Sequence, residues 1–83
     1  MTVRLHPHAQ ARLDERGATV EEVIATVKDG ETFPAKFHRT GFRRNYTFHG
    51  LWRGRRYHTK QVEAFAVRET AGWLVITVVV KYF

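Results

Sequence analysis

The first third of the chain has the hydrophobic spacing of helices. A set of apolar side chains recurs at intervals of three and four residues, which places them on one helix face: Val20, Val23, Ile24 and Val27. Thr19 and Glu22 match a capping box at the start of this helix, and Gly30 is typical of the residue that follows one. The pattern predicts a helix between Thr19 and Gly30.

A shorter helix is predicted ahead of it, between Pro7 and Gly17. Proline suits the first turn of a helix, because the N–H that it lacks has no helical partner there, and glycine suits the left-handed residue that ends a helix. Val3 and Leu5 alternate with polar neighbours, so a short strand is predicted at the start of the chain.

The second half alternates as strands do. Phe42, Tyr46 and Phe48 fall on one side of such a stretch, and the polar residues between them fall on the other. A second strand is predicted at about residues 57–68 and a third at residues 73–82. Turns are predicted between the strands at residues 50–54 and 71–72. The third strand is apolar on both faces, so we expect it in the middle of the sheet.

The order of elements is therefore strand, helix, helix and three antiparallel strands. This order predicts an α+β fold, with two N-terminal helices packed on one face of a three- to four-stranded antiparallel sheet. The chain has no repeat and no linker, so residues 1–83 are expected to form one domain.

The distribution of charge along the chain gives more information about function than the overall composition does. Fourteen Lys and Arg residues oppose eight Asp and Glu residues, which gives a net charge of +6. Eight of the basic side chains lie between Lys36 and Lys60, where there is no acid. Such an excess favours a polyanionic partner, through neutralised phosphates and released counterions, although it can also serve only solubility.

Several classes of protein are not supported. The chain has no cysteine, and its longest apolar run, residues 73–80, is far shorter than the ~20 residues that span a bilayer. No apolar signal segment is found, so a cytoplasmic location and no membrane contact are expected. The five histidines have no metal-ligand spacing, and no nucleotide-binding glycine loop occurs, so no metal and no cofactor are expected.

Aromatic and basic residues interleave from residue 52 to residue 60. Cations suit phosphates and aromatic rings can stack on bases, so this stretch is the predicted nucleic-acid-binding segment. Its binding residues are expected to be Trp52, Arg53, Arg55, Arg56 and Lys60. The alternative is a hairpin turn with solubilising charge, in which Trp52 and Tyr57 pair with each other. A second basic ridge is predicted on the first helix, where it would contact phosphate or an acidic protein or pair with Glu21 or Glu22: His8, Arg12 and Arg16.

The alternation of side chains along the predicted strands places a further set of residues on one face of the sheet. If the aromatic side of the first long strand faces the helices, the open face carries a set of two cations, an imidazole and a carboxylate: Arg43, His49, Glu63 and Lys81. Metal-free RNA cleavage needs a base, an acid and cations for the phosphorane, so these residues form a candidate catalytic set. The alternative is a solvated face with cross-strand ion pairs. By the same alternation, His58, Lys60 and Arg68 fall on the opposite face of their strand.

Residues 8–31 and 75–78 show a family likeness. The pattern comprises His8-Ala9, Arg12-Leu13, Glu15-Arg16-Gly17, Thr19, Glu22-Val23, Gly30-Glu31 and Val75-Ile76-Thr77-Val78. With the predicted element order, size and charge, it resembles the RelE/ParE-like superfamily of small toxins. It is most similar to BrnT-like toxins and a related family of small uncharacterised bacterial proteins.

The resemblance implies a RelE-like fold and a metal-independent endoribonuclease toxin of a toxin–antitoxin system. The implied partners are RNA or ribosome-bound mRNA and an acidic antitoxin protein, whether the chain is a monomer or a homodimer. Superfamily ribonucleases use basic and aromatic side chains near the C-terminus, and Lys81 and Tyr82 occupy that place here, which adds Tyr82 to the candidate catalytic residues. The alternative function is a non-catalytic basic module that binds nucleic acid or an acidic protein.

Overall fold

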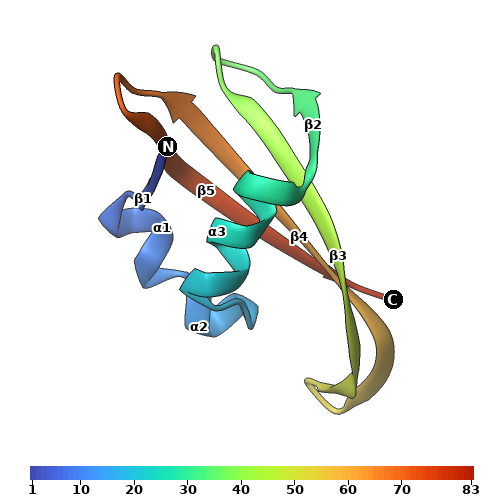
Figure 1. Cartoon of the computed structure of the whole chain (residues 1–83). Helices are drawn as coiled ribbons and strands as arrows, with labels where there is room; N and C mark the ends of the chain where they lie inside the picture. Colours follow the sequence, from blue (N-terminus) through green and yellow to red (C-terminus); the bar gives the residue numbers. More distant parts are fainter.

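Short helices cover one face of a five-stranded sheet in the computed structural model, which describes residues 1–83 (Figure 1). The elements are β1 (Thr2–Leu5), α1 (Pro7–Ala11), α2 (Leu13–Arg16), α3 (Val20–Asp29), β2 (Glu31–Pro34), β3 (Thr40–Trp52), β4 (Arg55–Arg68) and β5 (Gly72–Tyr82). The strand order is β1-β5-β4-β3-β2, and only the β1–β5 pair is parallel. The α+β class is confirmed, and β5 lies inside the sheet as predicted, between β1 and β4.

The sheet is larger than expected and is mixed instead of purely antiparallel. The extra edge strand is β2, which pairs with the start of β3 from Glu31↔Arg43 to Pro34↔Thr40. Its four residues include a proline and are mostly exposed, so no hydrophobic alternation marks it in the sequence. At the other edge, β1 runs parallel to β5, and three helices and three strands lie between these two segments along the chain.

The predicted ends of the helices are confirmed, but the first predicted helix is divided in two. Thr19 and Glu22 form both hydrogen bonds of the capping box, and Gly17 ends α2 with φ of 78°. The single helix expected from Pro7 is instead two short helices, α1 and α2. They divide at Arg12, whose N–H bonds to the carbonyl of Ala9 in a tighter turn.

The hydrophobic core lies between the helices and the sheet. Val23 of α3 packs toward the sheet, and Val62 and Val75 are likewise fully buried. Ala64 and Ala66 of β4 are also fully buried, and their small side chains let α3 approach the sheet closely. Each fully buried valine of this core contributes roughly 1.5–3 kcal/mol.

One bulge changes the predicted parity of β5. The β4–β5 register shifts between Phe65↔Thr77 and Ala66↔Val75, so Ile76 has no partner on β4. Uninterrupted alternation from Val78 and Val80 would turn Leu74 and Ile76 toward the helices, but the bulge gives the inward position to Val75 instead. An extra residue in one strand reverses the side-chain alternation on one side of the bulge.

A buried lysine joins the two layers. The Lys60 side chain points toward the helices, and Lys60 is 8% exposed. Its Nζ donates to the carbonyl oxygen of Gly17 at 2.9 Å and lies 2.8 Å from a carboxylate oxygen of Glu22. The Tyr46 hydroxyl donates to the Glu22 carbonyl at 2.8 Å. These contacts attach the start of α3 and the turn before it to β3 and β4.

We expect Lys60→Ala to lower the free energy of unfolding by about 3 kcal/mol, measured by urea denaturation, because it leaves the Glu22 carboxylate without its buried partner. Glu22→Gln should cost less, since an amide oxygen still accepts the capping hydrogen bond from Thr19. The matched control is Lys28→Ala on the exposed side of α3, with an expected change within about 0.5 kcal/mol. Equal effects of the two lysine substitutions would contradict this role.

Candidate nucleic-acid interface

The two longest strands continue beyond the helices as an arm, here residues 47–59. Figure 1 shows this β3–β4 hairpin extending past the layer that the helices cover. Trp52 pairs with Arg55, so only Arg53 and Gly54 form the turn, with φ of 51° and 82°. A two-residue hairpin turn of this kind needs positive φ at both positions, which explains the glycine.

The arm is also bent at a bulge. The register of β3 against β4 shifts between Thr47 and Gly50, and His49 has φ of 46°. The His49 and His58 rings meet edge to face, with their centroids 4.4 Å apart. The bulge therefore takes His49 out of the regular alternation that predicted its position.

The tip of the arm presents arginines to solvent. Arg53, Arg55 and Arg56 are all exposed, and none of them forms an ion pair. Arg53 donates to the carbonyl oxygen of Glu15 at 3.1 Å, so the tip contacts α2. Arg55 and Arg56 make no side-chain hydrogen bond within the protein. The tip is thus a cluster of positive charge with free donors.

Two of the predicted binding residues do not belong to this surface. The Trp52 ring stacks on the Tyr82 ring at 4.9 Å between centroids and 15° between planes. It also covers Gly17, where a Cβ would lie 2.7 Å from the indole. Lys60 is buried against Glu22, as described above. Both side chains hold the arm and the helices together, and neither is free to meet a ligand.

Tyr82 lies on the helix side of the sheet, away from the candidate catalytic set. Its hydroxyl donates to the carbonyl oxygen of Arg16 at 3.1 Å, and its ring also contacts Phe48 and Tyr57. Burial raises the pKa of the Tyr82 phenol, and the negative charge of Glu22 adds to the rise. The raised pKa means that the folded state favours the protonated phenol. Its contribution to the free energy of unfolding is therefore fully present below pH ~10 and is lost as pH rises through the folded pKa.

The open face of the sheet brings together three members of the predicted set. Glu63 is 4% exposed, and its carboxylate lies 2.8 Å from Nε of Arg43 and 3.5 Å from Nζ of Lys81. Arg43 also meets Glu31 at 3.4 Å. His49 and Tyr82 do not join this cluster. The arrangement is a cross-strand ion-pair network of two cations and two carboxylates, so its charges compensate one another.

The basic ridge on the first two helices is largely occupied within the protein. Arg12 pairs with Glu15 at 3.4 Å, and Arg16 donates to the carbonyl oxygen of Val78. The expected pairing with Glu21 or Glu22 is therefore wrong, because the Glu22 carboxylate is engaged by Lys60. Arg16 instead covers part of the β5 edge beyond the end of β1.

The chain belongs to a protein family described as Domain of unknown function (DUF4258), which it matches over residues 5–80. The match covers all or part of every helix and strand. No curated protein and no solved structure matches the chain. No helix of the structure has the length and apolar character needed to cross a membrane. The likeness to RelE-like and BrnT-like toxins rests on the sequence pattern and the order of elements.

We expect Trp52→Ala to lower the free energy of unfolding by about 2 kcal/mol, because it removes a half-buried ring from the contact with Tyr82 and Gly17. The pKa of Tyr82, followed by phenolate absorbance, should return toward its ordinary value of 10.0 as burial is relieved. Leu51→Ala, on the neighbouring exposed residue of the arm, is the matched control and should change stability by no more than about 0.5 kcal/mol. An unchanged stability in Trp52→Ala would show that the ring is free.

Proposed function

We propose that this protein is a small RNA-directed protein that contacts the phosphate backbone through the tip of the β3–β4 arm. One observation carries the proposal. Three exposed arginines without an ion pair, Arg53, Arg55 and Arg56, lie at the tip, and the sequence has no acid between Glu31 and Glu63. Arginine presents a fork of donors that matches phosphate oxygens, which makes a phosphate chain the best-suited partner.

The binding mode follows from which side chains are free. Because Trp52 is stacked on Tyr82, the tip offers charge and hydrogen-bond donors but no free indole for base stacking. Contacts of this kind position a protein on a nucleic acid without reading its sequence. Binding through the tip should therefore depend steeply on salt and little on base identity.

Replacing Arg53, Arg55 and Arg56 together by alanine should flatten the salt dependence of RNA binding. Each lost contact to single-stranded RNA removes roughly 0.7 from the slope of log K against log salt, so three contacts remove about 2. The measurement is fluorescence anisotropy of a labelled single-stranded RNA across a salt titration.

The matched control removes three positive charges far from the arm, in Arg4→Ala, Lys28→Ala and Arg68→Ala combined. This control should shift the slope much less than the arm variant. If the arm variant binds RNA as tightly as the wild type at every salt concentration, the tip is not the contact surface. Binding to an acidic protein but to no RNA would favour the alternative partner.

A second candidate function is the metal-independent endoribonuclease toxin with an acidic antitoxin. It is supported by the sequence resemblance and by the meeting of Arg43, Glu63 and Lys81 on the open face. Both Glu63 oxygens are engaged by these cations, so a substrate phosphate would have to displace Glu63 before Arg43 and Lys81 could stabilise a phosphorane. The same geometry serves equally as a stabilising ion-pair network, and the arm binding proposal does not depend on it.

Assays of growth and of RNA cleavage distinguish the toxin from a protein that only binds RNA. A toxin should arrest growth when expressed and cleave RNA, alone or on ribosomes, and Lys81→Ala should relieve both effects. Lys81 is the cleanest variant because it is exposed, whereas Glu63→Ala also leaves Arg43 without its buried partner. Gln61→Ala, on the adjacent strand of the same face, is the matched control and should keep full toxicity. A wild-type protein that is tolerated and cleaves no RNA would exclude the toxin.

A further inference from the structure

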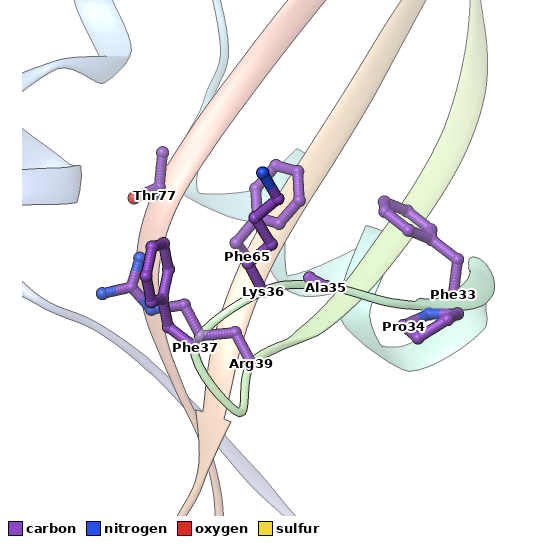
Figure 2. Close-up of a pocket in the computed structure, with 8 residues that line it drawn as sticks. All are labelled: Phe33, Pro34, Ala35, Lys36, Phe37, Arg39, Phe65 and Thr77. Carbon is purple, nitrogen blue, oxygen red and sulfur yellow. The ribbon is translucent and has the colours of Figure 1, made fainter.

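A groove lies on the open face of the sheet, at the end away from the arm. It has a volume of about 370 Å³ and runs between the sheet and the β2–β3 loop. In Figure 2, Phe37 and Arg39 lie at one end of the groove and Phe33 at the other, with Phe65 and Lys36 between them. Phe33 and Phe65 meet edge to face at 5.8 Å between centroids. The groove thus has aromatic walls and a cationic rim.

The turn at the rim has an unusual sequence for its geometry. The N–H of Arg39 bonds to the carbonyl of Lys36 at 3.3 Å, and the two residues between them have φ of 62° and 59°. Positive φ at both central residues is the turn that asparagine and glycine favour, yet Phe37 and His38 occupy it. A bulky side chain in this conformation is strained, and such strain is characteristic of functional sites.

The strained turn holds an aromatic ring in solvent. Phe37 is 79% exposed, the most exposed of the large apolar side chains. The Arg39 guanidinium lies 5.9 Å from the centre of its ring. Arg39 and Lys36 form no ion pair, so their charges are free to meet an anion. A flat aromatic group that carries negative charge nearby fits this combination of ring and cations.

We propose that the groove receives an unpaired base of single-stranded RNA, with Phe37 stacking on the base and Lys36 and Arg39 contacting an adjacent phosphate. The inference rests on the proposed function for its ligand, and it adds a second contact with a different chemistry. A base within a duplex is paired and stacked, so only a single-stranded segment can offer one to the groove. The groove therefore makes the protein selective for single strands.

Strand β4 connects the groove to the tip of the arm. Phe65, at the floor of the groove, and Arg56, near the tip, are nine residues apart on β4, or about 30 Å of extended strand. Arg43 and Lys81 lie on the open face between the two ends. An RNA strand that contacts the tip with its backbone and places a base in the groove therefore has to span this length of β4.

The test uses a short single-stranded RNA that carries 2-aminopurine, whose fluorescence falls when the base is stacked. With the fluorescent base moved through the positions in turn, one position should be quenched by the wild-type protein. Phe37→Ala should remove that quenching and weaken binding by about 5- to 100-fold, as expected when one stacked base is lost. Phe83→Ala, which truncates another exposed phenylalanine outside the groove, is the matched control and should leave both unchanged.

Two further sets of variants test the cation at the groove and the strained turn. Arg39→Gln should weaken binding more than Lys28→Gln, although both remove one positive charge. Replacing the turn with Phe37→Asn and His38→Gly should raise the melting temperature by about 4–8 °C, because both residues suit positive φ, while it removes the quenching.

The outcomes separate the groove from the arm. If Phe37→Ala retains the quenching and affinity of the wild type while the arm variant loses affinity, the groove proposal is wrong and the arm contact stands. Duplex RNA bound as tightly as the single strand would also overturn the groove. If the wild-type protein binds no RNA at any salt concentration, both proposals are wrong.

Discussion

Lys60 places an ammonium group between the helices and the sheet, and much of the structure depends on how that charge is satisfied. Its partners are the carboxylate of Glu22 and the carbonyl oxygen of Gly17. The same carboxylate accepts the capping hydrogen bond from Thr19, so one side chain both starts α3 and neutralises the lysine. A buried charge without such partners would be strongly destabilising. The contact therefore determines where the turn before α3 sits on β4.

That position has consequences for the arm. Gly17 has positive φ and no side chain, which leaves room for the Trp52 ring to lie over it and stack on Tyr82. The arm is thereby attached to α2 and not left as an isolated two-stranded ribbon, which would be marginally stable in water. The aromatic residues of this region serve the fold, whereas the arginines beyond them face solvent. The division between the two roles explains how a strongly basic hairpin can remain ordered.

Charge on this protein divides into paired and unpaired groups. In the middle of the open face, Arg43 and Lys81 are balanced by Glu63 and contribute cross-strand ion pairs. At the tip of the arm, Arg53, Arg55 and Arg56 have no carboxylate partner, and neither have Lys36 and Arg39 at the groove. Unpaired cations retain both their field and their donors for a polyanion. Because unrelated activities share similar small folds, this distribution of free charge carries more functional information than the fold itself.

The sequence by itself determined the features that neighbouring residues decide. The capping box of α3, the glycine after α2 and the doubly apolar β5 were all predictable, because each depends on spacing within a few residues. Strand alternation likewise placed Arg43, Glu63 and Lys81 on one face, since side chains alternate with a period of two.

The tertiary structure decided what depends on residues distant along the chain. Strand β2 is stabilised by its pairing with β3, and its own four residues carry no alternating pattern. The bulges near His49 and Ile76 arise from strand pairing and reverse alternation locally. Strand alternation turns Lys60 toward the helices, but its charge predicts an exposed side chain, because its partner Glu22 lies 38 residues away in the sequence. Burial and ion pairing are properties of such long-range contacts, which spacing along a single chain does not encode.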